Sequence, residues 1–187
     1  MSKFTLRRAA TLEDVTLEGL AALTIDCVDG GASIGFMHPL SEAQARAFWQ
    51  RVAAGVSAGE RALLVAEDAD GVAGTVQLLL AQPDNQPHRA DLAKLQVHRR
   101  ARGRGLAEAL MREAEQMAAD CGKTLLVLDT VTGSAADRLY TRLGWQRVGE
   151  VPDFALWPRG GLCPTTFFYK RVGSAPEEPS PRTSIAA

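Results

Sequence analysis

The stretch that most constrains the fold runs from Leu95 to Ala107, where a short apolar segment leads through a glycine–arginine loop into an amphipathic helix. Its sequence is LQVHRRARGRGLA, with the spacing Arg100-x-x-Gly103-x-Gly105. The two glycines permit a tight turn and leave successive backbone N–H groups uncovered beside the N-terminus of the helix. A strand that ends in such a loop and helix predicts an α/β arrangement with an anion site at the loop.

The predicted helix has a single apolar face, which braces the loop against a core. Its apolar residues recur at i, i+3 and i+4 spacing, at Leu106, Ala109, Leu110, Ala114 and Met117. Positive charge beside the loop comes from Arg100, Arg102 and Arg104. Basic runs such as HRRARGR also occur in nucleic-acid-binding arms and on solvated surfaces, so the sequence on either side of the loop must separate these alternatives.

A second motif follows the loop helix. The apolar run Thr124 to Thr130 is typical of a buried strand, and Ser134 to Leu143 predicts a helix that ends at Gly144. Within it the chain has the pattern Ala-x-x-Leu-Tyr-x-x-Leu-Gly-Trp, with the tyrosine at Tyr140. The two motifs, in this order and at this distance, resemble the hallmarks of the GNAT superfamily of N-acetyltransferases.

The resemblance implies a fold and a co-substrate. The fold is α/β: a mixed, mostly antiparallel sheet of six to seven strands, flanked by about four helices, with splayed central strands. The co-substrate is acetyl-CoA, without a metal ion, and the backbone N–H of Val97 is expected to polarise the acetyl carbonyl at a strand bulge. The implied acetyl-CoA contacts are the pantetheine-binding strand Leu95, Gln96 and Val97, the pyrophosphate loop Arg100, Arg102, Gly103, Arg104, Gly105, Leu106 and Ala107, and finally Ser134 and Tyr140.

A closer resemblance is to the tabtoxin resistance acetyltransferase branch. It covers most of residues 3–172, and the piece GGASIGF is its most specific part. The stretches that carry it are Gly30 to Met37, Arg89 to Leu95, Ala101 to Leu106, Leu128 to Thr130 with Gly133 and Ser134, and Arg147 to Pro152. That branch implies an acidic residue at two positions that bind or deprotonate the acceptor, here Asp91 and Asp129. Asp91 replaces a glutamate of the branch and is shorter by one methylene.

The chemistry gives these acids and Tyr140 possible roles. An alkylamine with a pKa of about 10.4 is mostly protonated at neutral pH, so acetyl transfer needs a base or a water relay. The resemblance implies that Tyr140 protonates the departing thiolate. Each residue also has a purely structural alternative. Asp91 could form an ion pair with Arg89 or Lys94, Asp129 could be a turn or cap residue, and Tyr140 could be a core residue.

The early helices and two further segments, Gly30 to His38 and Val151 to Pro164, are expected to select the acceptor. The aromatic or titratable candidates there and on the early helices are Phe36, His38, Trp49, Phe154 and Trp157. Without an acidic cluster to dock a basic peptide tail, the better hypothesis is a small, amino-acid-like amine. The alternatives from other classes are a non-catalytic acetyl-CoA sensor and a nucleic-acid-binding module.

Composition bounds the remaining possibilities. The 187 residues, 46% of them hydrophobic, suffice for one α/β domain, expected over residues 1–172 and followed by a disordered Pro-, Ser- and Glu-rich tail over 173–187. A formal net charge of −1 argues against binding to nucleic acid or an anionic membrane. Three widely spaced cysteines, the lack of a leader and the lack of an apolar run of membrane-spanning length predict a cytoplasmic protein, and the family makes a homodimer possible.

The other elements follow from local patterns. The sequence predicts an edge strand over 4–8, a helix over 12–28 that starts at a Thr11/Asp14 box, and a helix over 42–55 capped by Ser41. An Asp-Gly turn predicts a hairpin of strands 61–67 and 72–80. A long strand is expected over 88–98, before the glycine–arginine loop.

Overall fold

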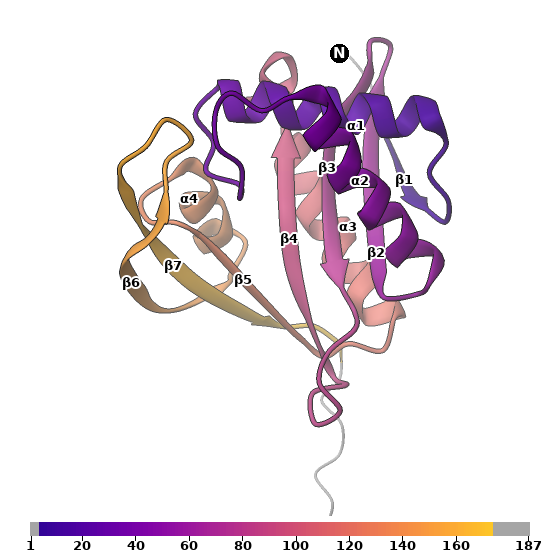
Figure 1. Cartoon of the computed structure of the whole chain (residues 1–187). Coiled ribbons are helices and arrows are strands. Elements are labelled where there is room, and N and C mark those ends of the chain that lie inside the picture. Colours follow the sequence, from indigo (N-terminus) through magenta and orange to yellow (C-terminus); the bar gives the residue numbers. More distant parts are fainter. Residues whose placement is uncertain (1–3, 174–187) are drawn as a thin grey trace, which may run out of the picture.

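The computed structural model describes residues 4–173, so the tail expected over 173–187 lies, apart from its first residue, outside the described residues. Seven strands, four α-helices and one short 3₁₀ helix make up this part of the chain; Figure 1 shows their arrangement. In chain order they are β1 (Thr5–Ala9), α1 (Asp14–Asp29), α2 (Glu42–Ser57), β2 (Arg61–Asp68), β3 (Gly71–Leu79), β4 (Arg89–Val97), η1 (Arg99–Ala101), α3 (Leu106–Asp120), β5 (Leu125–Val131), α4 (Ala135–Arg142), β6 (Gln146–Leu156) and β7 (Leu162–Arg171).

The strands form one mixed sheet in the order β1-β2-β3-β4-β5-β7-β6. Only the central pair β4 and β5 is parallel, and every other neighbouring pair is antiparallel. The parallel pairing runs from Arg89 opposite Leu125 to Asp91 opposite Val127, after which the two strands diverge (Figure 1). The predicted mixed sheet with splayed central strands is therefore confirmed.

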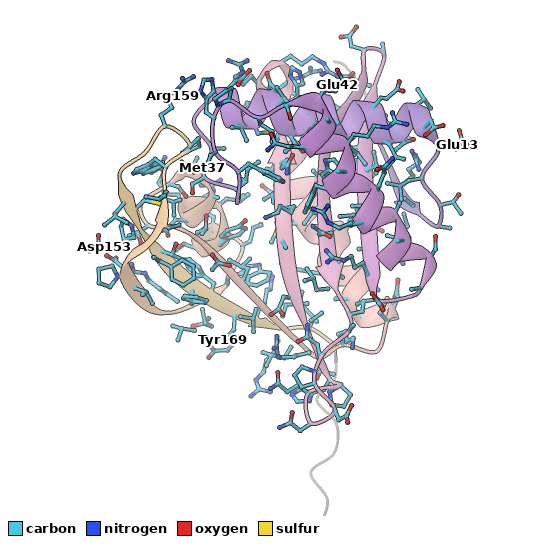
Figure 2. All side chains as sticks on the ribbon, in the orientation of Figure 1. Glu13, Met37, Glu42, Asp153, Arg159 and Tyr169 are labelled. Atoms are coloured by element: carbon cyan, nitrogen blue, oxygen red, sulfur yellow. The ribbon has the colours of Figure 1, made fainter. Side chains whose placement is uncertain are left out.

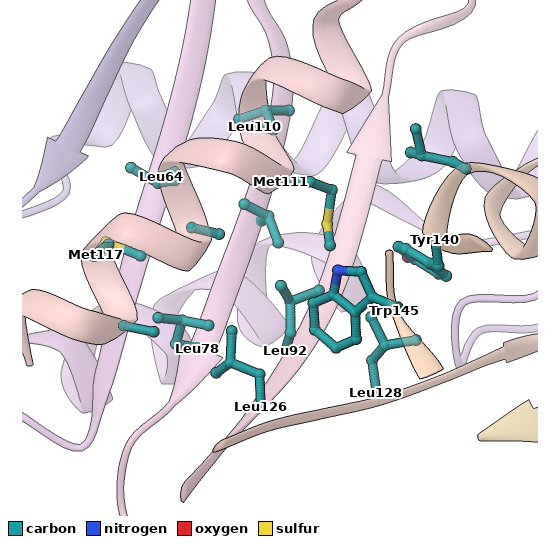
Figure 3. Packing of buried hydrophobic residues seen from close by; sticks show 14 of the residues in the cluster. Leu64, Leu78, Leu92, Leu110, Met111, Met117, Leu126, Leu128, Tyr140 and Trp145 are labelled. Atoms are coloured by element: carbon teal, nitrogen blue, oxygen red, sulfur yellow. The ribbon is translucent and has the colours of Figure 1, made fainter. Parts of the chain in front are cut away.

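Helices cover both faces of the β1–β4 half, and the alternation of side chains along β2 reflects this. Leu63 and Val65 belong to the buried cluster under α1 and α2, whereas Leu64 and Ala66 belong to the cluster under α3. The second cluster continues to the aromatic residues of α4 and the turn after it (Figure 3). Because both faces are covered, β2 is apolar at successive positions rather than at alternate ones.

The N-termini of α1 and α2 differ in whether the local sequence was sufficient to predict them. Ser41 caps α2 as predicted, accepting a hydrogen bond from the Gln44 amide while the Gln44 side chain bonds back to the Ser41 amide. The predicted Thr11/Asp14 start of α1 is wrong, because the chain is still extended at Glu13, which is the N-cap and provides no side-chain cap. α1 is instead held by its buried face, which includes the fully buried Leu20 and Leu23.

A β-bulge interrupts β4 just beyond its separation from β5. Gln77 of β3 is opposite Ala93, but Thr75 is opposite Gln96, so β4 has one extra residue in this interval. Lys94 lies in the bulge with a left-handed φ of 55°. The bulge moves every following side chain of β4 to the opposite face of the sheet.

Gly74 brings β3 close to the start of α3. A Cβ at this position would lie 3.0 Å from the carbonyl oxygen of Gln96 and 3.0 Å from Cδ1 of Leu110. We expect Gly74→Val to lower the free energy of unfolding by about 1–3 kcal/mol, since a fixed backbone oxygen cannot move aside. Gly149→Val on the edge strand β6, where a Cβ would meet nothing within 4 Å, is the matched control. Urea denaturation compares the two variants, and an equal effect would contradict the packing argument.

Candidate functional site

The glycine–arginine loop between η1 and α3 has the backbone geometry of an anion cradle. Gly103 and Gly105 have φ values of 72° and 78°, in the left-handed region that favours glycine. Gly105 is the N-cap of α3. A Cβ built at either glycine would meet nothing within 4 Å, so the space above the loop is open to a ligand.

The amides of this loop are not used by the fold. The first backbone hydrogen bond of α3 runs from the Ala109 amide to the carbonyl oxygen of Gly105, at 3.1 Å. Within residues 4–173, the amides of Gly103, Gly105, Leu106 and Ala107 therefore have no backbone acceptor. Uncommitted N–H groups at the positive end of a helix dipole bind phosphate, so the loop fits the pyrophosphate of acetyl-CoA.

The arginines of the loop have different positions. Arg100 donates to the buried carboxylate of Asp68 at 2.8 Å and to the carbonyl oxygens of Gly71 and Val72. The hydrogen bond from Arg100 lowers the pKa of Asp68 below its ordinary value. Arg100 therefore fastens the loop to the β2–β3 hairpin, with its guanidinium directed to the hairpin.

The other two arginines remain near the loop. Arg102 donates from Nε to the carbonyl oxygen of Val97 at 3.2 Å, and its exposed side chain lies next to the cradle. The guanidinium of Arg104 lies over the ring of Phe4, 4.6 Å from its centroid. Both arginines belong to the loop that carries the open amides.

The predicted pantetheine strand has an unpaired edge. Past Asp91, β4 has no strand partner on the side of β5, while it keeps its pairing with β3 through Val97. The side chain of Gln96 is buried under α1, where its Oε1 accepts a hydrogen bond from Thr24. The free edge of β4 over Leu95, Gln96 and Val97 can therefore pair with an extended arm through backbone groups alone.

Tyr140 lies in α4, almost completely buried, at 4% exposure. Its ring packs against Trp145 and Phe168 at centroid distances of 6.0 and 5.9 Å (Figure 3). Burial, and secondarily the charge of Asp129, raises the pKa of the phenol well above its ordinary value. Among the described residues, the Tyr140 hydroxyl has no hydrogen-bond partner. It is nevertheless not one of the fully buried polar atoms without a partner, which are Gln96 Nε2 and Arg100 Nε. The hydroxyl therefore keeps contact with solvent.

The two predicted acids have different surroundings. Asp91 is held in place, because Arg89 donates to its Oδ1 at 2.5 Å and Gln82 to its Oδ2 at 3.0 Å. Asp129 lies on β5 beyond the point of divergence, opposite Phe167 of β7. The residue as a whole is exposed, but desolvation of its carboxylate raises its pKa, the charge of Lys94 lowers the pKa, and that of Asp91 raises it further. Asp129 thus has the more available carboxylate.

Ser134 is the N-cap of α4. Its hydroxyl oxygen accepts a hydrogen bond from the Asp137 amide at 3.1 Å, and the Asp137 carboxylate accepts one from the Gly133 amide. Helix capping therefore explains why a serine stands at position 134, while the O–H of Ser134 remains available to a ligand.

Sequence reasoning missed Lys94 as a candidate site residue. Its ammonium lies 5.9 Å from the ring centroids of both Phe36 and Phe48. A signal was present in β4: Ala90 and Leu92 alternate toward the α3 cluster, and strict alternation would place a lysine next in that apolar cluster. Such a conflict indicates a bulge.

The two segments expected to select the acceptor contact each other. Ser33 donates to the carbonyl oxygen of Leu156 at 2.9 Å, and the His38 amide donates to Pro158 at 2.8 Å. Arg159 lies 3.1 Å from Nδ1 of His38, and Figure 2 shows it on the same side of the molecule as Met37 of the α1–α2 loop. The loop between α1 and α2 is therefore anchored to the β6–β7 hairpin.

The aromatic candidates separate into core and surface residues. Trp49 is fully buried and donates to the Thr24 hydroxyl at 2.8 Å, so it is a core residue. Phe36 packs edge-on against Phe48 beside Lys94. Phe154 and Trp157 are 50% and 40% exposed.

Other kinds of site find no support in residues 4–173. No group of three or more His, Cys, Asp or Glu side chains in this range could hold a metal ion. None of its helices is long and apolar enough to cross a membrane. All three cysteines are free.

Comparison with known proteins gives a consistent result. The sequence model of the acetyltransferase (GNAT) family matches residues 32–145. Human N-acetyltransferase 8B is 38% identical over 113 residues, 59% of this chain and 49% of the relative, and rat N-acetyltransferase 8B is 37% identical over 100 residues, 52% and 45%. The chain thus spans about half the length of these curated relatives.

Solved structures share the fold over nearly the whole chain. The Salmonella typhimurium protein yncA, solved with its cofactor acetyl-CoA, has a TM-score of 0.76 at 21% identity and covers 96% of this chain and 99% of its own. A GCN5-related N-acetyltransferase from Kribbella flavida has a TM-score of 0.74 at 26% identity, over 90% of this chain and 98% of its own.

The cradle geometry predicts a selective effect of one glycine. Gly103→Val should weaken acetyl-CoA binding by about 100-fold or more, since the side chain blocks approach to several N–H groups whose hydrogen bonds to a charged ligand contribute about 1.5–3 kcal/mol each. Gly122→Val is the matched control, because Gly122 has the same φ of 72° and equally open surroundings at the other end of α3. Calorimetric titration measures both, and normal affinity in folded Gly103→Val would exclude the loop as the acetyl-CoA site.

Proposed function

The chain belongs to the acetyltransferase (GNAT) family, and we propose that it catalyses direct transfer of an acetyl group from acetyl-CoA to the amine of a small, amino-acid-like acceptor. The observation that carries the proposal is the arrangement at the divergence of β4 and β5. The phosphate cradle follows β4, while Asp129 lies on β5 past the last paired residue. One strand thus leads to the cradle, and the other presents a carboxylate.

The cradle and the free edge of β4 are the parts that would hold acetyl-CoA, which supplies a thioester for the reaction. The amides of Gly103, Gly105 and Leu106 would receive the pyrophosphate, with Arg102 and Arg104 adding charge. The edge over Leu95 to Val97 would align the extended arm. We carry over from the family the role of the Val97 N–H in polarising the acetyl carbonyl, next to the bulge at Lys94.

Asp129 is our candidate for the proton acceptor. The acceptor's ammonium must lose one proton before its nitrogen can form the new C–N bond, and the carboxylate of Asp129 takes that proton directly or through water. A raised pKa makes this carboxylate a stronger base than an ordinary aspartate. Asp91, with both oxygens already hydrogen-bonded, would act on Asp129 through its charge.

Tyr140 is our candidate for the proton donor. Its raised pKa keeps the phenol protonated at neutral pH. When the C–S bond breaks, the Tyr140 O–H donates its proton to the departing sulfur. The nitrogen of the new amide loses its second proton at this stage, which returns to the Tyr140 phenolate through water, and the first proton leaves Asp129 to solvent. Ser134 is retained as a further acetyl-CoA contact through its free O–H.

The acceptor class rests on two supports. The resemblance to the tabtoxin resistance branch points to an amino-acid-like amine and to a role in toxin or antibiotic resistance. N-acetylaspartate synthetase from Danio rerio, whose name denotes an N-acetylated amino acid, is 34% identical over 82 residues, 43% of this chain and 29% of the relative. A single domain over residues 1–172, a cytoplasmic location and a homodimer remain predictions from the sequence.

The test is calorimetric titration with acetyl-CoA, followed by thiol release with a panel of amines that includes tabtoxinine-β-lactam. Binding with turnover on any amine supports the proposal and identifies the acceptor. Binding without turnover on the whole panel would favour a non-catalytic sensor. A lack of binding would overturn the proposal.

Asp129→Asn should separate function from stability. We expect kcat to fall by about 10²–10⁴, the range for a lost general base, with unchanged acetyl-CoA affinity. Desolvation of the carboxylate raises the pKa of Asp129 above the ordinary 3.8. The folded chain therefore binds the carboxyl proton more tightly than the unfolded chain does. As a result, the free energy of unfolding falls as pH rises from 3.8 through the raised pKa. The variant avoids that loss and should be more stable than the parent at pH 7, with no advantage well below pH 3.8.

Urea denaturation at several pH values measures the stability effect, and thiol release measures kcat. Asp84→Asn, on the exposed loop between β3 and β4, is the control for loss of one negative charge. Wild-type turnover in Asp129→Asn would exclude this carboxylate as base and as acceptor ligand.

Tyr140→Phe should lower kcat by about 10²-fold or more, the contribution of a positioned proton donor, because only the hydroxyl is lost. The ring packing and acetyl-CoA affinity should be retained. Thr141→Ala, which removes an exposed hydroxyl one residue further along α4, is the control. An unchanged rate would return Tyr140 to a purely structural role.

A further inference from the structure

Lys94 carries its ammonium group at the bulge of β4. Among residues 4–173 it forms no ion pair and no hydrogen bond, although an ammonium has three N–H donors. Its surroundings are the rings of Phe36 and Phe48 and the backbone of Gly35, where a Cβ would lie 3.2 Å from Nζ. A charged group held among apolar surfaces without a counter-ion is costly unless an anion joins it.

The backbone holds the lysine there at a further cost. Lys94 has a left-handed φ of 55°, a conformation that costs an L-residue about 1–2 kcal/mol. The bulge directs its side chain to the rings of the α1–α2 loop and α2, away from the α3 cluster that strict alternation would assign to it. Strain of this kind persists where the surrounding structure imposes it, and it is common at ligand-binding positions.

Asp129 provides the opposite charge on the neighbouring strand. Lys94 and Asp129 influence each other's titration, yet no ion pair joins them. Burial lowers the pKa of Lys94, with the charge of Asp129 raising it and that of Arg61 lowering it. The site thus contains one cation and one anion that form no ion pair with each other, on the two strands that diverge.

We propose that Lys94 binds the carboxylate of the acceptor while Asp129 holds its amine, so that the enzyme selects a zwitterionic amino acid over an amine without an acidic group. The inference rests on the proposed function for the role of Asp129. Lys94 is a specificity residue in this scheme: it forms a charge-assisted hydrogen bond with the acceptor and takes no part in proton transfer. Phe36 and Phe48 limit water at that bond.

The experiment uses matched acceptors that differ only at the carboxylate. Each set consists of an L-amino acid, its amide and the corresponding amine, for example methionine, methioninamide and 3-methylthiopropylamine. Binding is measured by calorimetry on protein saturated with CoA, where no turnover occurs, and kcat/KM is measured by thiol release with acetyl-CoA. The parent should prefer the amino acid over its amide by about 10- to 100-fold in both measurements, the range for a hydrogen bond between charged groups.

Lys94→Met tests the residue, since it keeps an unbranched apolar stem between the two rings and removes the charge. We expect it to lose the preference for the amino acid mainly through KM, with little change for the amide and none in acetyl-CoA affinity. Lys94→Arg should restore part of the preference. Arg112→Gln, on the exposed side of α3, is the control for loss of one positive charge.

The outcomes separate the inference from the proposed function. Binding of the amino acid that depends on Lys94, even without turnover, supports the inference while the proposed function fails. Turnover with an equal preference for acid and amide, or a preference that survives Lys94→Met, overturns the inference and leaves the acetyltransferase in place. If no amino acid binds better than its amide, the inference is also overturned.

Discussion

The early end of the pairing between β4 and β5 is the constraint on which the rest of the site depends. The two parallel strands share hydrogen bonds only through Asp91 and Val127. Beyond that point β4 stays with β3, β5 stays with β7, and each central strand has an unpaired edge. Unpaired backbone groups in a sheet bind water or another partner, so the separation of the strands leaves an edge at which an extended ligand could pair.

The bulge at Lys94 determines what each side of β4 presents. Before it, Ala90 and Leu92 pack in the α3 cluster; after it, Leu95 and Val97 do so, while Gln96 is buried under α1. One extra residue thus keeps the apolar side chains in the core and leaves Lys94 at the position where the side chains of β4 change from one face of the sheet to the other. The same backbone event aligns the free edge and places the unpaired ammonium beside Phe36 and Phe48.

The anion cradle depends on both local backbone geometry and tertiary contacts. Its open amides follow from two left-handed glycines at the start of a helix, a property of the local chain. Its position depends on Arg100, which binds Asp68 and two carbonyl oxygens of the β2–β3 hairpin. An arginine that the motif suggests as a ligand contact is therefore also the fastening between the loop and the sheet.

The sequence by itself determined the elements with strong local signals. The alternation of strands and helices, the Ser41 cap, the Asp-Gly hairpin and the glycine loop follow from spacing and turn chemistry that act over a few residues. The resemblance to known motifs added the sheet type and the positions of Tyr140 and Asp129. The local features depend on neighbours along the chain and could for that reason be predicted, whereas the sheet type, which depends on pairing between distant strands, followed from the resemblance.

Only the tertiary structure decided how the predicted residues differ from one another. In the fold, Asp91 accepts hydrogen bonds from Arg89 and Gln82, whereas the carboxylate of Asp129 stays available. Trp49 lies in the core, and Lys94 lies at the candidate site. Each of these outcomes depends on contacts between residues far apart in the chain, and on a bulge that changes the phase of β4. Hydrophobic periodicity records which face of an element is buried, but the charge partners of a side chain are set only when distant strands and loops come together.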